Sequence, residues 1–247
     1  MTIYRPRLIR YLVMTIGLTG AYDALAVEAP DIVYLNRCAG GCQVQGGADD
    51  AINGKSSLIS GSHTAAAFPY ADSVFDETAA CVRTTLAPYN VQVRITGPGA
   101  VPRREIMLTT VPATVGLSAG SAEAAPFDGS PRENAIAFVF ATSIGPNVES
   151  LCWITAEAIG NLYALDFVTS CLDIMSWTPG CGVKSFTNQD APCSGAFGTP
   201  GQCFLGNTTQ NSAAMLGVTP GPTDIVFENG LEAFQTPRDG PSPPPPG

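Results

Sequence analysis

The sequence contains a single histidine, His63, and only 13% of its 247 residues are charged. Zinc sites in proteins normally draw on three or four His or Cys ligands, so one histidine leaves little material for such a site. A Ser-His-Asp triad could be assembled only by placing His63 arbitrarily. The segment GPGAVPRR (97–104) lacks the lysine and the spacing of a P-loop. These absences argue against the commonest hydrolytic and phosphate-binding sites.

Positive charge is also scarce, with 12 Lys and Arg against 21 Asp and Glu. A chain this acidic should repel nucleic acid and anionic membranes, so we expect neither as a partner. Acidity of this kind also keeps an exported protein in solution, which needs no specific partner. Beyond the N-terminus no hydrophobic run is long enough to span a bilayer, so no stable membrane insertion of the mature chain is expected.

The first 26 residues have the pattern of a secretory signal peptide. Arg5, Arg7 and Arg10 precede the mostly apolar run YLVMTIGLTGAY, and Ala24-Leu25-Ala26 is a small-x-small cleavage pattern. The apolar run is short for a membrane span, which favours removal over anchoring. We therefore predict a signal peptide at 1–26 and a secreted, periplasmic or cell-surface location, with a net charge of −11 after cleavage.

Eight cysteines follow the predicted cleavage site, and an even number in an exported chain predicts disulfides. Eight cysteines allow 105 connectivities, so spacing alone does not fix the pairing. Our prediction joins near neighbours and pairs the two that remain, giving Cys38–Cys42, Cys171–Cys181, Cys193–Cys203 and Cys81–Cys152. The last pair would tie two predicted helices together. A metal-binding or redox role for CAGGC (38–42) is disfavoured, because the loop has no histidine and is not C-x-x-C.

Strand and helix signals alternate along the chain and predict an α+β fold. β-branched and aromatic residues indicate strands at 31–36, 91–96, 105–111 and 135–142. Helical spacing of apolar residues indicates two main helices, at 72–89 and at about 147–165. Asp72 is the expected N-cap of the first helix. We expect a mixed, twisted sheet of four to five strands with these two helices.

The remaining segments are read as connections. Gly- and Ser-rich loops are expected at 39–61 and 113–133. A loop-rich, disulfide-stapled C-terminal part is expected at 178–234, with a short helix near 210–217. The Pro-rich segment 235–247 predicts a polyproline-type disordered tail, so one domain would cover 27–234.

The stretch 156–177, AEAIGNLYALDFVTSCLDIMSW, resembles the metzincin zinc-protease signature in its matrixin-like form, A-H-E-x-G-H-x-x-G-L-D-H followed by D-x-M-S. The positions shared with that signature outside its ligands are Ala156, Gly160, Leu165 and Asp166. Residues 173–176, DIMS, match the Met-turn that contains Met175. YLNRC near the start and GCGVKSF after the Met-turn are similar to bacterial secreted members. The resemblance covers roughly residues 30–180, with its specific part in the motif helix and Met-turn at 148–177.

In the family, two histidines four residues apart and a third after a turn bind zinc, and a glutamate beside the first acts as general base. Carried over by position, the first ligand is replaced by Glu157 and the base by Ala158. The second ligand is replaced by Asn161, the third by Phe167 and the turn glycine by Ala164. The resemblance therefore implies a member without catalytic residues, zinc or another cofactor.

Two alternatives would restore part of the site. Shifting the register by one residue puts Glu157 on the base position and Asp166 on the third ligand, but leaves Ala156 and Gly160 on the first two. Combining His63 with Glu157 and Asn161 gives a weak ligand set. Both are disfavoured, and the same helix is also compatible with an ordinary amphipathic core helix.

The resemblance implies a pseudoprotease that binds a peptide or protein in the former substrate cleft by strand addition. The segment EIMLTTV (105–111) is expected to be the strand at the edge of that cleft. Two other functions remain open: a secreted zinc metalloendopeptidase with an atypical site, and a cell-surface structural protein with the Pro-rich tail as spacer.

Overall fold

A computed structural model describes residues 29–221. Its main sheet has five strands in the order β5-β1-β6-β8-β7. Their bounds are β1 (Asp31–Asn36), β5 (Val91–Arg94), β6 (Arg104–Thr109), β7 (Glu123–Ala124) and β8 (Ala135–Phe140). The first four strands of that order are parallel, and β7 is antiparallel to β8. The α+β class and the size of the sheet are as the sequence predicts.

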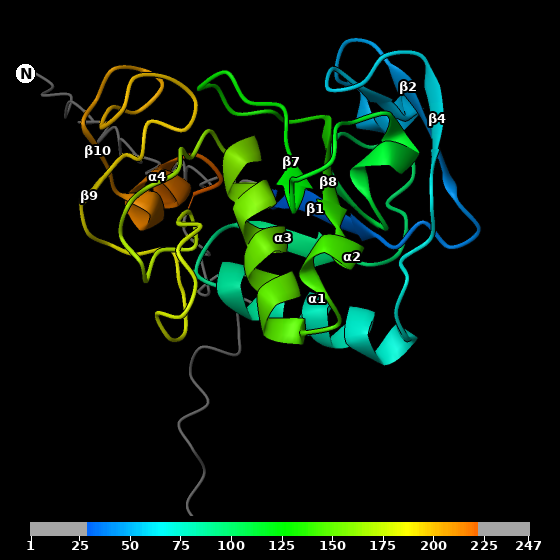
Figure 1. The fold of residues 1–247 in the computed structure, drawn as a ribbon, viewed down its shortest axis with the longest axis horizontal. Helices are drawn as coiled ribbons and strands as arrows, with labels where there is room; N and C mark the ends of the chain where they lie inside the picture. The colour runs from blue at the N-terminus through cyan, green and yellow to red at the C-terminus, as the bar shows by residue number, and fades with distance from the viewer. Residues whose placement is uncertain (1–28, 222–247) are drawn as a thin grey trace, which may run out of the picture.

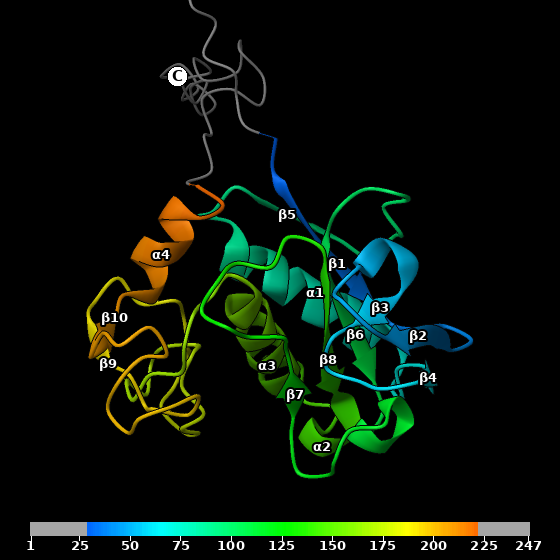
Figure 2. The ribbon, with the colours of Figure 1, turned by 90° about the horizontal axis from the view of Figure 1, so that it is seen from above.

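Two long helices cover one face of this sheet: α1 (Asp72–Leu86) and α3 (Val148–Leu162). Alternate residues of the central strands, such as Ile106 and Val139, point into the core shared with these helices. The short helix α2 (Ala141–Ile144) connects β8 to α3. Figure 2 shows helices, sheet and a smaller sheet as successive layers. Cys81–Cys152 joins α1 to α3, as predicted, so the position of α3 is fixed covalently.

The other face of the main sheet is covered by a small three-stranded sheet, in a region expected to be loop. Its elements are β2 (Cys42–Gly46), β3 (Lys55–Ser56), β4 (Ser62–Ala65) and the 3-10 turn η1 (Ala51–Asn53). A second 3-10 turn, η2 (Pro112–Val115), lies beside β4. Phe138 and Phe140 of β8 pack into this second core. The prediction of a loop at 39–61 was wrong because short, glycine-containing strands carry little periodicity.

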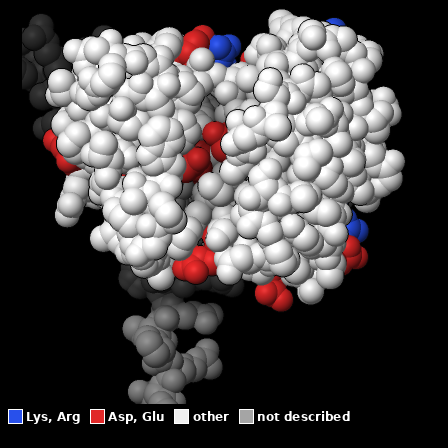
Figure 3. All heavy atoms as spheres, in the orientation of Figure 1, with Lys and Arg blue, Asp and Glu red and all other residues white. Residues whose placement is uncertain are grey.

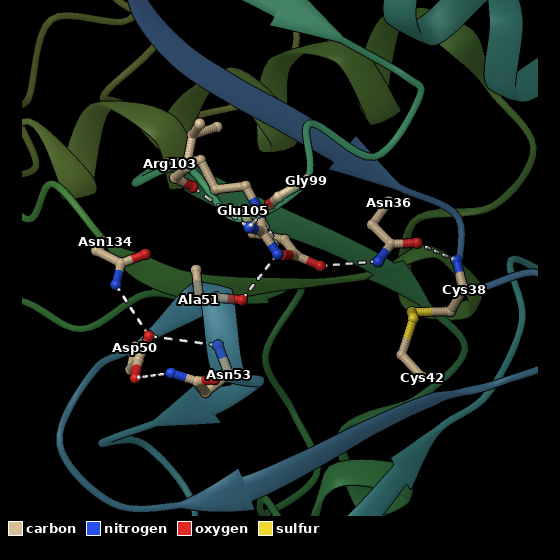
Figure 4. Close-up of polar contacts among 11 residues, drawn as sticks. Asn36, Cys38, Cys42, Asp50, Ala51, Asn53, Gly99, Arg103, Glu105 and Asn134 are labelled. Carbon is tan, nitrogen blue, oxygen red and sulfur yellow. Dashed lines mark hydrogen bonds and ion pairs between the residues drawn. A yellow bond between two sulfur atoms is a disulfide. The ribbon is translucent and has the colours of Figure 1, made fainter.

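A buried polar network links the small sheet to the main sheet (Figure 4). Glu105 of β6 accepts hydrogen bonds from Asn36 Nδ2 at 2.7 Å and from Arg103 Nε at 2.9 Å. Arg103 Nη2 also donates to the carbonyl of Ala51 in η1, at 2.8 Å. Asp50 accepts from Asn134 Nδ2 at 3.0 Å on the other side of η1. Because each buried charge has a partner, this network is explained by structure alone.

Residues 165–221, here called the C-terminal lobe, pack beside α3 and carry little regular structure (Figure 1). The elements are β9 (Ala191–Pro192), β10 (Thr209–Gln210) and α4 (Ser212–Val218). Cys171–Cys181 and Cys193–Cys203 staple its loops, and Cys38–Cys42 closes the turn before β2. All four predicted pairs are therefore confirmed.

Several sequence-based expectations need correction. EIMLTTV is not an edge strand, because β6 pairs with β1 on one side and β8 on the other. The edge beside α3 is β7, inside the predicted loop 113–133. Helix α1 has Ala71, not Asp72, as its N-cap, without a side-chain hydrogen bond. The predicted signal peptide and Pro-rich tail lie outside the described residues. Between residues 29 and 221, no helix is long and apolar enough to cross a membrane.

Candidate functional site

One face of α3 carries Trp153, Glu157 and Asn161, which follow one another at intervals of four residues. The helix starts where the Asn147 side chain accepts a hydrogen bond from Ser150 N, at 2.8 Å. Glu157 is only 5% exposed and Asn161 only 1% exposed. A charged and an amide side chain therefore lie in the interior, at the positions where the resemblance puts two metal ligands.

The turn that follows α3 combines a left-handed residue with a close contact to Met175. Ala164 adopts a left-handed conformation with φ of +66°, at the position of the motif's turn glycine. Gly160 packs directly against Met175, since a Cβ on Gly160 would lie 2.4 Å from Met175 Sδ. Leu165 N also donates to Gly160 O at 2.9 Å. A larger residue at position 160 would displace the Met175 side chain, which the glycine lets pack directly on the helix.

The Met-turn is held from inside by Asp173, which is fully buried. One carboxylate oxygen accepts from Met175 N at 2.9 Å and from Ser212 Oγ of α4 at 3.1 Å. The other accepts from Thr187 N and Thr187 Oγ1. Several charge-assisted hydrogen bonds on one buried carboxylate hold the turn in shape.

An aromatic side chain occupies the position of the third ligand. Phe167 is 9% exposed and stacks on Trp177 at 5.9 Å and on Phe197 at 5.1 Å between ring centroids. Phe197 in turn stacks on Phe127 at 4.2 Å. This aromatic column, Phe127, Phe197, Phe167 and Trp177, ends at Trp177, which is 65% exposed. A ring packed in this way cannot coordinate a metal.

A second carboxyl group approaches Glu157 from β7. Asn161 Nδ2 donates to Glu123 Oε1 at 3.3 Å, while the other oxygen, Oε2, is buried and accepts no hydrogen bond from a described residue. Glu123 keeps some exposed surface elsewhere, so its burial is concentrated at the carboxylate. Figure 3 shows acidic atoms in the hollow between the C-terminal lobe and the rest, over α3 and β7. We call Glu123 and Glu157 the acidic pair.

Both carboxyls of the acidic pair are electrostatically unusual. Burial raises the pKa of Glu123 to about 8. Burial also raises the pKa of Glu157 to about 8, with a further contribution from the nearby charge of Glu123. A carboxyl with such a pKa is largely protonated at neutral pH, and it can accept a cation only after losing that proton.

One cation lies near the acidic pair without forming an ion pair with it. Lys184 is 7% exposed, and its Nζ donates to the Ser176 carbonyl in the Met-turn. The same Nζ lies 5.9 Å from the Trp153 ring centroid. Burial lowers the pKa of Lys184, although Glu157 and Asp173 oppose that change. Lys184 is thus committed to the Met-turn.

The other residues that the sequence suggested as metal ligands or general base do not form a site with Glu157. His63 is in β4, where its ring packs against Gly116 and its Nε2 lies 2.8 Å from Ser60 O, so it is not brought to Glu157. Ala158 is buried and has no proton-accepting group. Asp166, the alternative third ligand, accepts from the backbone of Phe167 and Phe204. Within residues 29–221, no three His, Cys, Asp or Glu side chains are grouped so that they could hold a metal ion.

The segment GLSAG (116–120) matches the G-x-S-x-G pattern of serine hydrolases, so the expectation from the sequence that no such pattern occurs was wrong. That motif needs a sharp turn between a strand and a helix. Here the segment is a loop between η2 and β7, and Ser118 forms no hydrogen bond with His63. The pattern therefore lacks the geometry of a nucleophile.

Sequence reasoning missed Glu123 and Lys184. Glu123 lies 34 positions before Glu157 in a loop-like segment, and no local pattern links the two. The only available signal was a charged residue within the short apolar segment AEAAPF, which is weak.

A scan against models of known protein families gives no match, and no curated protein shows significant sequence similarity to this chain. The family and the function of the chain are therefore inferred from its own residues and geometry.

Proposed function

We propose that this chain is an exported, metzincin-like pseudoprotease that binds a peptide or protein segment in the former substrate cleft without cleaving it. The observation that carries the proposal is the contrast within one motif. Gly160, Ala164 and Met175 keep the close contacts and the backbone turn of the signature. Glu157, Ala158 and Phe167 replace two of its ligands and its base.

The strand arrangement supports the same proposal. The resemblance implies the order strand, helix, three strands, motif helix and Met-turn. The chain has β1, α1, then β5, β6, β7 and β8, and then α3 and residues 173–176, with the small sheet β2–β4 inserted between β1 and α1. The antiparallel strand β7 is last in the sheet order and pairs only with β8. It lies beside α3, next to the hollow in Figure 3. An edge strand with one unpaired side can add an extended peptide through main-chain hydrogen bonds.

Four disulfides, with every cysteine of the described chain paired, support export. Such bonds form and persist in oxidising compartments. They also support the reading of residues 1–26 as a signal peptide, since that segment would deliver the chain to such a compartment.

The first test measures zinc in the oxidised chain 27–247 after dialysis against zinc and then against buffer. The matched comparison is a variant that restores the signature with Glu157→His, Ala158→Glu, Asn161→His and Phe167→His. We expect no retained zinc in the natural chain and about one zinc per chain in the restored variant. Stoichiometric zinc in the natural chain, with cleavage of a casein substrate, would instead support a metalloendopeptidase. A folded variant that binds no zinc would refute the family relationship.

The second test asks for a ligand. Random octapeptide libraries, acetylated and amidated, are incubated with the natural chain, and amide hydrogen exchange is followed at residues 121–125. Added protection of β7 is expected, because strand addition pairs its free edge. Tight binding that leaves β7 exchange unchanged would place the peptide elsewhere and refute the cleft as the binding site.

A further inference from the structure

Packing does not explain the burial of the acidic pair. Glu157 is 95% buried, and no ion pair joins its carboxylate to a residue between 29 and 221. Glu123 Oε2 and Asn161 Oδ1 are buried and have no hydrogen-bond partner within that range. Other buried acids, such as Glu105 and Asp173, have at least two partners.

Leaving these groups unpaired is costly, since a buried polar atom without a partner loses its hydration and gains nothing in return. Two carboxyls that also repel each other add to that cost. Groups retained at such a cost are typical of sites whose partner comes from outside the protein. Once ionised, Glu157 and Glu123 place two negative charges near each other, beside Asn161, so the partner that complements them is a cation.

Lys184 does not supply this cation. Its Nζ bonds to the Ser176 carbonyl, and no ion pair joins it to either carboxylate. It marks one end of the α3 face, beside Trp153. At the other end Asn161 contacts Glu123, and no ion pair joins Glu123 to another residue between 29 and 221.

A metal ion suits this donor set poorly. Zinc prefers nitrogen and sulfur ligands, and calcium takes six to eight oxygens, whereas Glu123, Glu157 and Asn161 supply a small set. Asn161 is further constrained because its Nδ2 donates to Glu123. A lysine or arginine side chain needs only a few oxygen acceptors for its head group. Its apolar stem can also lie along aromatic surface, which the neighbouring aromatic column offers at Trp177.

We propose that Glu157 and Glu123, assisted by Asn161, form a subsite for a Lys or Arg side chain of the peptide bound along β7. This inference rests on the proposed function and names its ligand class. A peptide added to the free edge of β7 sends alternate side chains toward the sheet face, where the acidic pair lies. The cation replaces the protons on the carboxyls, so binding releases protons to solvent.

The test compares two octapeptide libraries that differ only at one fixed position, lysine in one and norleucine in the other. Norleucine keeps the stem and lacks the charge. Binding to the oxidised chain 27–247 is measured by fluorescence anisotropy at pH 6, 7.5 and 9. We expect the lysine library to bind at least about tenfold more tightly at pH 9, as for a charged hydrogen bond, and the ratio to fall toward pH 6. The preference for lysine should grow with pH, because the carboxylates, whose pKa is about 8, are ionised above that pH.

Variants assign the effect to residues. Glu157→Gln and, independently, Glu123→Gln should bring the lysine-to-norleucine ratio close to one while norleucine binding persists. Glu77 is an exposed acid on α1 that is not part of the acidic pair. Glu77→Gln removes the same charge and should leave the ratio unchanged. Circular dichroism checks that each variant is folded. If only one of Glu157→Gln and Glu123→Gln folds, that variant alone is enough to test the subsite.

The outcomes separate this inference from the proposed function. Equal binding of both libraries to the natural chain leaves peptide binding intact and overturns the cation subsite. Absence of binding by either library overturns the proposed function, and the subsite with it. Calcium or zinc that binds the natural chain, is lost in Glu157→Gln and displaces the lysine library would overturn the inference by assigning the acidic pair to a metal.

Discussion

Replacing Glu157 by glutamine should prevent much of the loss of stability that the protein undergoes as pH rises into the alkaline range. Burial raises the pKa of Glu157 from 4.5 to about 8. The folded state therefore holds a proton that the unfolded state releases above pH 4.5. Stability is complete below pH 4.5 and declines as pH rises through about 8. Glutamine mimics the protonated carboxyl and does not titrate.

The size of the effect follows from the pKa difference. Each pKa unit corresponds to about 1.4 kcal/mol, so the full shift corresponds to about 5 kcal/mol. Rotation of the carboxylate toward water in the hollow would lower that value, and we therefore expect about 2–5 kcal/mol. At pH 9 the Glu157→Gln variant should be more stable than the natural chain by this amount, and at pH 4.5 the two should be nearly equal.

Urea unfolding measured by fluorescence of Trp153 and Trp177, at intervals from pH 4.5 to 9, gives the free energy of unfolding directly. The matched control is Glu77→Gln, whose exposed carboxyl should give a difference independent of pH. Parallel curves for Glu157→Gln and the natural chain over this range would refute the reasoning, because they would mean that Glu157 is hydrated and titrates normally.

Three further changes test the frame of the motif, each by urea unfolding. Ala164→Gly should stabilise the fold by about 1 kcal/mol, because a left-handed alanine costs about 1–2 kcal/mol and glycine's extra unfolded-state entropy offsets part of it; no gain would contradict this. Gly160→Ala should destabilise the fold by about 1–3 kcal/mol, because the new methyl group clashes with Met175. Adding Met175→Ala should relieve that clash. If the stability losses of the two single variants simply add in the double variant, the two residues are not in contact. Asp173→Ala should cost about 3 kcal/mol or more and expose the Met-turn to proteolysis, whereas an intact turn would show that the Asp173 bonds are dispensable.

The sequence predicted the features that depend on strong local patterns. The periodicity of 147–165 identified α3, and close cysteine spacing identified three disulfides. Cys81–Cys152 followed because only two cysteines remained. In each case the physical signal extends over neighbouring residues, either as one face of a helix or as a short loop that a disulfide can close.

Features that depend on long-range packing were predicted poorly. The segment EIMLTTV was assigned to an edge, although a continuous apolar run is typical of a parallel strand buried on both faces, which β6 is. Strand β7 has two residues and no alternation, so nothing in its sequence distinguishes it from a loop. Glu123 meets Glu157 only because β7 and α3 lie side by side, and tertiary packing alone creates that contact.

The energetics of the frame explain why it can persist without ligands. Met175 packs on Gly160, Asp173 holds the Met-turn with hydrogen bonds, and Cys81–Cys152 anchors α3, so no metal is needed for the shape. Phe167 at the third-ligand position gains stacking energy and is explained by packing. Glu157 is different, because an apolar residue there would avoid the cost of burying a carboxyl. Packing therefore explains Phe167 but does not explain Glu157, and binding of an external cation is the explanation that the chemistry of the carboxyl favours.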